Sequence, residues 1–194
     1  MTSRQTRAAQ VGDLCVLLVP THSQSPVIRT QLADLQRQFG GEIVAPLHVT
    51  CQRFSATDEQ LEALKPHLSA LCERSAPIHV VGKRLEPFYS TFRAQEILKC
   101  HLAANSNLTK FISDVKASMS AAGIGAHYEA SDSPITLLEG VKINRLNVFE
   151  FRRKLFIGQR LLLTRIKSPG HYSTLFSAAF ADVLEPELQV SDLL

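Results

Sequence analysis

Apolar residues in the first quarter of the chain predict a strand, a helix and a second strand. Residues 14–19 form an unbroken apolar run, which is typical of a strand buried on both faces. A helix is expected to begin at Pro26 and to end at the glycine pair 40–41. Residues 43–54 are predicted to form the second strand. The apolar face of the helix is expected to contain Ile28, Leu32, Leu35 and Phe39.

The same order of elements returns in the second half of the chain. Residues 92–102 predict a strand and residues 134–138 a short apolar strand. The helix between them is expected to bury Leu108, Phe111, Ile112, Val115 and Met119. This repetition predicts two similar lobes of strand, helix and strand with a cleft between them.

Further elements surround these two units. Thr57 and Gln60 have the spacing of a capping box at the start of a helix. Residues 77–85 predict a strand interrupted at Gly82. Residues 161–166 and 172–180 predict a hairpin, since the turn between them contains proline and glycine.

The second strand contains two polar residues at alternate positions. In a strand, residues two apart point to the same face, so His48 and Thr50 are expected to lie side by side. An imidazole beside a hydroxyl can transfer a proton and bind a phosphate oxygen. A half-buried strand with one polar face gives the same pattern, so this pair alone does not define a site.

Composition predicts an ordinary globular protein. Hydrophobic residues make up 45% and charged residues 20% of the 194 residues. We expect one domain over residues 11–184, between a loose N-terminal tail, 1–10, and an acidic C-terminal tail, 185–194. The net charge of +3 is compatible with an anionic ligand. A monomer is expected.

The cysteines and the apolar segments indicate a cytoplasmic protein. The four cysteines are widely spaced without a C-x-x-C pair, so we expect reduced thiols in the core. The apolar segment 11–20 is too short for a signal sequence or a membrane span. No membrane partner is therefore expected.

Common catalytic motifs are absent from the sequence. It contains no Gly-x-Ser-x-Gly, Walker loop, dinucleotide fingerprint or His-Glu-x-x-His. Its seven histidines are scattered without the spacing of metal ligands. We expect neither a metal site nor another cofactor.

Four segments resemble the two-histidine phosphoesterases, the superfamily of 2'–5' RNA ligase-like proteins and cyclic phosphodiesterases. They are residues 14–19, 48–50, 92–98 and 134–137. The resemblance covers residues 12 to about 182 as an order of elements. It implies a bilobal α+β fold in which each lobe presents one His-x-Thr or His-x-Ser motif to the central cleft.

The second motif departs from the family pattern at Pro134. The spacing from His48 to Pro134 equals that from Thr50 to Thr136, but proline has no titratable group. The second motif therefore lacks the histidine that the family pattern places at this position. Three histidines elsewhere are candidates to replace it: His101, His127 and His171.

The resemblance implies general acid–base hydrolysis of a phosphodiester without a metal. In the family, one imidazole takes a proton from water, the other protonates the leaving oxygen, and the threonines hold the phosphoryl oxygens. Here His48 would move the proton and Thr50 and Thr136 would hold the phosphate. Arg93 and Arg53 would bind the substrate.

Three functions remain open on the sequence. The first is a cyclic phosphodiesterase, that is, a phosphoric diester hydrolase, or an RNA ligase-like enzyme, acting on 2',3'-cyclic or 2'-linked nucleotide phosphates. The second is a degenerate member that binds a nucleotide or RNA-end phosphate without turnover, because Pro134 replaces the second histidine. The third is an unrelated globular protein with a chance His-x-Thr. The basic residues of segment 141–154, Arg145 among them, are not assigned to ligand or to solvent.

Overall fold

The computed structural model of the protein describes residues 8–20, 26–127, 134–142 and 148–181. The predicted C-terminal tail and most of the predicted N-terminal tail lie outside these residues, as does Arg145. The elements in chain order are β1 (Leu14–Val19), α1 (Pro26–Phe39), β2 (Glu42–Ile43), β3 (Val49–Phe54), α2 (Asp58–Glu73), β4 (Ile78–Ser90), β5 (Gln95–Leu102), α3 (Ser106–Ala121), β6 (Ile135–Glu139), β7 (Phe149–Glu150), β8 (Lys154–Gly158), β9 (Arg160–Ser168) and β10 (His171–Ala179).

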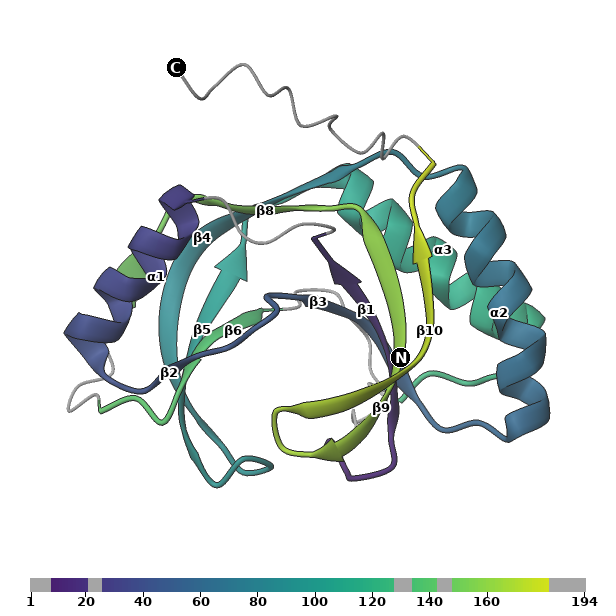
Figure 1. The fold of residues 1–194 in the computed structure, drawn as a ribbon, viewed down its shortest axis with the longest axis horizontal. Coiled ribbons are helices and arrows are strands. Elements are labelled where there is room, and N and C mark those ends of the chain that lie inside the picture. The colour runs from purple at the N-terminus through teal and green to yellow at the C-terminus, as the bar shows by residue number, and fades with distance from the viewer. Residues whose placement is uncertain (1–7, 21–25, 128–133, 143–147, 182–194) are drawn as a thin grey trace, which may run out of the picture.

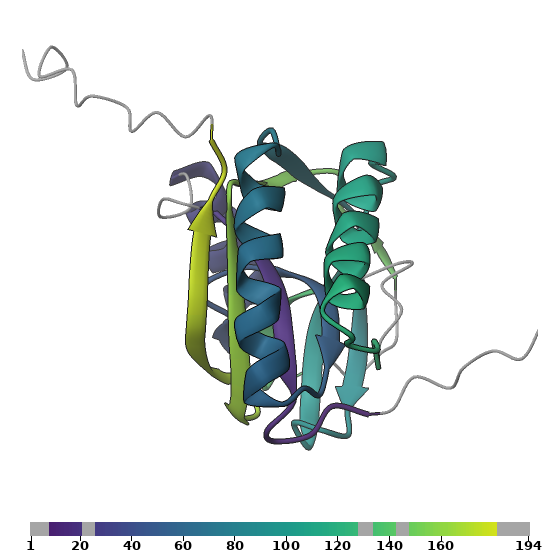
Figure 2. The ribbon, with the colours of Figure 1, turned by 90° about the vertical axis from the view of Figure 1, so that its right-hand side faces the viewer.

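Two sheets build the α+β fold. One has the strand order β10-β9-β1-β3, and the other has the order β2-β6-β5-β4-β7, with β8 paired to β4. The two sheets face each other, with α1 outside one and α2 and α3 outside the other (Figure 1). Figure 2 shows α2 and α3 side by side in front of the strands.

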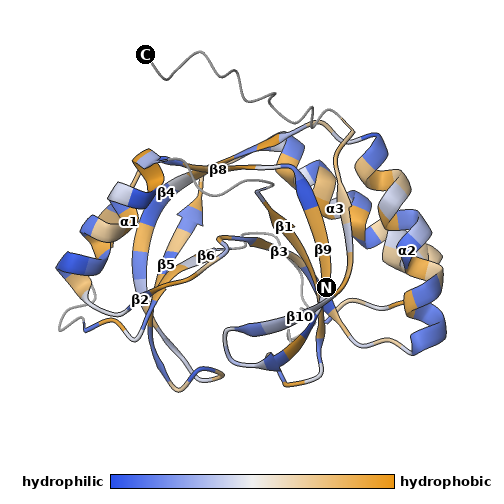
Figure 3. Cartoon of the chain, viewed as in Figure 1, coloured by the Kyte–Doolittle hydropathy of each residue, from blue (hydrophilic) through white to orange (hydrophobic). Residues whose placement is uncertain are grey.

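Local sequence explains where the helices begin, end and pack. The predicted apolar face of α1 is buried, and Gly40 ends this helix with a φ of 69°. The capping box predicted at Thr57 is present at the start of α2. The apolar side of each helix is turned towards the strands and the hydrophilic side outward (Figure 3).

The strand expected over residues 43–54 is divided in the structure. Its first part is β2, which pairs with β6, and its second part is β3, which pairs with β1 in the other sheet. Pro46 lies between the parts, and proline has no N–H to donate to a ladder. His48 consequently precedes β3 by one residue instead of lying within a strand.

Two other strand boundaries differ from expectation. Residues 91–94 form a turn in which Ala94 has a φ of 52°, so β5 begins at Gln95 instead of residue 92. At Gly82, where a break was expected, β4 stays continuous from Ile78 to Ser90, but its ladder with β5 is irregular between Gly82 and Arg84. The bare Cα of Gly82 lets Cys100 and Phe151 approach, since a Cβ there would lie 2.7 Å from Cys100 Sγ.

The predicted repetition of strand, helix and strand is confirmed in the strand pairing. In the first half, β3 pairs antiparallel with β1, and Thr50 lies opposite Leu17. In the second half, β6 pairs antiparallel with β5, and Thr136 lies opposite Lys99. The helices α1 and α3 occupy the same place in the two chain orders.

The two ladders also share an irregularity. Each skips one residue of the motif strand, Cys51 in β3 and Leu137 in β6, and in both cases this residue directly follows the motif threonine. Since the bulges coincide, Thr50 and Thr136 are equivalent by register. Pro134 then corresponds to His48, as the spacing along the chain predicts.

The cysteine prediction is confirmed, because Cys15, Cys51, Cys72 and Cys100 are all buried free thiols. Burial raises the pKa of each thiol to about 12. Among the described residues, no helix is both long and apolar enough to cross a membrane.

Candidate functional site

His48 is held by the residue that interrupts its strand. Its Nδ1 lies 2.9 Å from the carbonyl oxygen of Pro46, and its side chain is half-buried. A carbonyl oxygen accepts only, so Nδ1 is the protonated nitrogen of the neutral ring and donates this hydrogen bond. Nε2 then keeps its lone pair, which makes it the proton acceptor of the ring.

The surroundings of His48 favour the neutral ring. Burial lowers the pKa of His48, and the positive charge of Arg93 lowers it further, while the Pro46 carbonyl acts in the opposite direction. The net direction is downward, so His48 holds no extra proton at neutral pH. This is the state that a general base requires.

Tyr172 packs against the ring of His48. The ring centroids are 5.6 Å apart and the planes meet at 78°, an edge-to-face contact. Tyr172 belongs to β10 and also packs on the small apolar cluster formed by Cys15, Leu17, Val19 and Ile166. Burial raises the pKa of its hydroxyl, so Tyr172 stays uncharged. This contact joins the C-terminal hairpin to the first motif.

The sequence did not predict the role of Tyr172. In this segment the sequence singles out His171, which is exposed at the start of β10, whereas its neighbour Tyr172 is half-buried. The available signal was an aromatic residue next to the serine and threonine residues of the last hairpin. It could not be interpreted without knowing that the hairpin reaches His48.

Both motif threonines turn their side chains away from the core. Thr50 is half-buried between the buried residues Val49 and Cys51. Thr136 is half-buried between the buried residues Ile135 and Leu137. The phosphate-binding role of the two hydroxyls and the central cleft between them remain predictions.

Arg93 forms an ion pair with Glu139 beside this site. Only 9% of the Arg93 side chain is exposed, and Gln95 Nε2 also donates to the Glu139 carboxylate over 3.4 Å. The turn between β9 and β10 lies against this pair, since a Cβ on Gly170 would be 2.9 Å from Arg93 Nη1. Arg93 thus acts on His48 as a nearby charge, although Glu139 balances part of it. Its predicted contact with substrate remains a prediction.

Arg53 forms the corresponding ion pair in the first half. Its Nε lies 3.6 Å from Asp13 Oδ2, with 13% of the arginine side chain and 4% of the aspartate side chain exposed. Such buried pairing fits a structural role as well as substrate binding. The predicted role of Arg53 in binding substrate remains a prediction.

The three candidate replacements for the second histidine lie in different places. His101 pairs with Glu86 across β4 and β5. His127 lies at the end of β3, where its Nε2 is 3.1 Å from Ser55 Oγ and its N–H donates to the Arg53 carbonyl. His171 is exposed at the start of β10. The structure gives these three side chains no common site.

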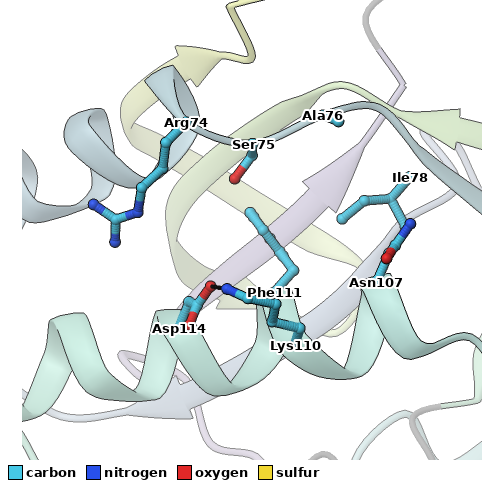
Figure 4. A pocket seen from close by; sticks show the side chains of 8 residues that line it. All are labelled: Arg74, Ser75, Ala76, Ile78, Asn107, Lys110, Phe111 and Asp114. Carbon is cyan, nitrogen blue, oxygen red and sulfur yellow. Dashed lines mark hydrogen bonds and ion pairs between the residues drawn. The ribbon is translucent and has the colours of Figure 1, made fainter.

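A separate hollow of about 220 Å³ lies between the end of α2, β4 and α3. Figure 4 shows Phe111 pointing into it from α3, and Lys110 in a hydrogen bond with Asp114. The motif residues do not line this hollow. Within the described part of the chain, no group of three or more His, Cys, Asp or Glu side chains is arranged to hold a metal ion.

This fold is the fold of the two-histidine phosphoesterases. LigT of E. coli, a 2'–5' RNA ligase solved with NADP+, matches with a TM-score of 0.59 at 14% identity, over 89% of this chain and 99% of LigT. TT0787 of Thermus thermophilus matches with a TM-score of 0.58 at 19% identity, over 87% of this chain and 98% of its own. A crystal structure of a phosphoesterase matches with a TM-score of 0.58 at 15% identity, over 88% and 99%.

At the level of sequence, no protein-family model matches the chain, and no curated protein matches it significantly. The identities to the solved structures are below 20%, so the likeness concerns the fold. The sequence resemblance to the two-histidine phosphoesterases is thereby confirmed for the fold.

Proposed function

We propose that the protein hydrolyses 2',3'-cyclic or 2'-linked nucleotide phosphates by general acid–base chemistry without a metal, with His48 as the base. The observation that carries this proposal is the orientation of the His48 ring. The Pro46 carbonyl accepts a hydrogen bond from Nδ1–H, so Nε2 is left as a proton acceptor on the residue two positions before Thr50.

The proposed reaction begins when His48 Nε2 takes a proton from water. The water oxygen attacks phosphorus, and negative charge grows on the phosphoryl oxygens. The hydroxyls of Thr50 and Thr136 donate hydrogen bonds to these oxygens, which stabilises the transition state more than the substrate. The equal register of the two threonines supports their joint action on one phosphate.

Ligands of a structurally similar protein support the substrate class. LigT of E. coli has been crystallised with 3'-AMP, with ATP, with NADP+ and with phosphate. All four ligands carry phosphate, and three contain a nucleotide. The proposed partner of this protein is therefore a nucleotide or an RNA-end phosphate.

The alternative is a module that binds the same phosphates without turnover. Pro134 favours it, because loss of one general acid or base typically lowers a rate by about 10²–10⁴-fold. In that case the threonines would still bind phosphate, and His48 would add a hydrogen bond instead of moving a proton.

The two functions are separated by an assay with the four nucleoside 2',3'-cyclic phosphates. We expect release of a nucleoside monophosphate by the wild-type protein and a loss of about 10²–10⁴-fold in kcat/KM for His48→Gln. The control is His67→Gln, an exposed histidine of α2, which should keep wild-type activity. Calorimetry with 3'-AMP measures binding in parallel.

Each result favours one function. Turnover that His48→Gln removes supports the enzyme. Binding of 3'-AMP without turnover supports the binding module. Neither turnover nor binding contradicts both, and turnover that survives in His48→Gln contradicts the proposed role of His48.

A further inference from the structure

Lys99 lies beside the motif threonine in the half of the molecule that has Pro134 in place of the second histidine. It is the residue directly opposite Thr136 in the β5–β6 ladder, and residues opposite each other point to the same face. Its neighbours in β5, Leu98 and Cys100, are buried in the core, whereas Lys99 is half-buried. Lys99 and Thr136 therefore project together from the side of the sheet that turns away from the core.

The ammonium of Lys99 is held without a carboxylate partner. Its Nζ lies 3.2 Å from the centroid of the Phe88 ring, a cation–π contact. Within the described residues, this nitrogen forms no ion pair, and the carboxylate of Glu86, the residue opposite it in β4, pairs with His101. A cation fixed by a ring keeps its N–H groups available to an incoming anion.

The titratable side chains on the same face as Lys99 are Glu86 and Arg84 from β4 and His101 from β5, its own strand. Glu86 lies opposite Lys99, and Arg84 lies opposite His101 on the same face. Burial lowers the pKa of Lys99, and the Glu86 carboxylate counteracts this only in part. The lowered pKa makes the ammonium a better proton donor than an exposed lysine.

Because both ladders have a bulge directly after the motif threonine, Leu17 and Lys99 occupy equivalent positions in the two halves. In the first half the residue opposite the motif threonine is the apolar Leu17, and the histidine of that motif is present. In the second half the residue opposite the motif threonine is Lys99, and the histidine position is Pro134. The half whose motif lacks its histidine is thus the half with a lysine opposite the motif threonine.

We propose that Lys99 is the general acid of this protein, which protonates the leaving oxygen in place of the absent second histidine. This inference rests on the proposed hydrolysis. As His48 Nε2 takes a proton from water, the water oxygen bonds to phosphorus and the P–O bond to one ribose oxygen breaks. That oxygen takes a proton from the Lys99 ammonium. Solvent then removes the proton from His48 and returns one to the neutral lysine.

Two substitutions of Lys99 separate proton donation from charge. Lys99→Arg keeps the charge and the contact with Phe88, but a guanidinium does not release its proton in proteins. Lys99→Met removes the charge and keeps an unbranched side chain over the ring. We expect both to lower kcat on 2',3'-cyclic phosphates by about 10²–10⁴-fold, and both to remove the fall of activity at alkaline pH. The control is Lys110→Met, an exposed residue of α3.

A substrate that needs no general acid provides the sharper readout. In a nucleoside 4-nitrophenyl phosphodiester the phenolate leaves without a proton, so Lys99→Arg should approach wild-type kcat on it while remaining slow on the cyclic substrate. If Lys99→Arg retains wild-type kcat on the cyclic phosphate, or is equally slow on both substrates, the proposal is wrong. Absence of turnover in the wild-type protein overturns this proposal together with the proposed hydrolysis, whereas the other two results overturn the role of Lys99 alone.

Discussion

The two halves of the molecule share a backbone and differ in their chemistry. Both pair the motif strand antiparallel with the first strand of the half, and both place a bulge directly after the motif threonine. The first half adds a histidine whose tautomer is set by the Pro46 carbonyl. The second half has Pro134 at the position of this histidine, and Lys99 lies opposite Thr136 in its ladder. The two halves therefore share their backbone geometry at the motif and differ in the titratable side chains that surround it.

A second difference lies three residues beyond each threonine. The first half has Arg53 there, paired with Asp13, and the second half has Glu139, paired with Arg93. At this equivalent position the ion pair of the first half has its positively charged residue, and the ion pair of the second half has its negatively charged residue. Since Arg93 also lowers the pKa of His48, the second half contributes to the electrostatics of the first.

The largest effect that tests this equivalence is expected at the two threonines. Thr50→Val and Thr136→Val each remove a hydroxyl that would bind the phosphoryl oxygens. Loss of one such donor lowers kcat by about 10²–10³-fold, and we expect similar losses at the two positions. Steady-state kinetics on a 2',3'-cyclic phosphate measures both.

Serine substitutions serve as matched controls, because Thr50→Ser and Thr136→Ser keep the hydroxyl and should retain most of the activity. A large loss at Thr50 with none at Thr136 would show that the equal registers do not correspond to equal roles.

Restoring the family motif is the next test of the comparison. Pro134→His supplies the second imidazole at the position that matches His48. If Lys99 already donates the proton, Pro134→His should change the wild-type rate little but raise the rate of the Lys99→Met variant by about tenfold or more. Measuring both backgrounds on the same substrate gives the coupling between the two positions.

An equal gain in both backgrounds would mean that the histidine and the lysine act independently. No gain in either would mean that the second half has lost the geometry as well as the imidazole.

The sequence predicted the elements well where a simple periodicity governs them. The stripe of α1, the capping box of α2 and the C-terminal hairpin follow from local patterns, and the structure confirms them. The split of the strand at 43–54 was missed because its apolar pattern continues past Pro46. The two parts belong to different sheets, and only tertiary pairing reveals this.

Of the residues around the candidate site, those of the two motifs could be predicted from the sequence. His48, Thr50 and Thr136 can be found from spacing, since their relation is local or repeated. Tyr172 and Lys99 could not be found in this way. The first reaches His48 from the far end of the chain, and the second is linked to Thr136 by ladder register.

Arg93 allows a test of the electrostatic link between the halves. In Arg93→Gln a positive charge near His48 is removed and Glu139 loses its partner, and both changes raise the pKa of His48. A base with a higher pKa becomes protonated at higher pH, so the acid limb of the kcat/KM profile should move to higher pH. The pH–rate profile of the variant checks this.

The double variant Arg93→Gln/Glu139→Gln removes both charges of the pair. Its acid limb should lie between those of the wild-type protein and the single variant. An unchanged acid limb in the single variant would show that Arg93 does not influence the base.

The smallest effect is expected at Tyr172, where the contact with His48 is apolar. Tyr172→Phe keeps the ring edge against the imidazole, whereas Tyr172→Ala removes it. An aromatic pair contributes about 0.5–1.5 kcal/mol, which corresponds to a loss of about two- to tenfold if the contact orients the ring. We expect this loss in kcat for Tyr172→Ala and less for Tyr172→Phe, with KM nearly unchanged. If the phenylalanine variant is as slow as the alanine variant, the hydroxyl and not the ring is what His48 requires, and Tyr172 would then join the polar part of the site.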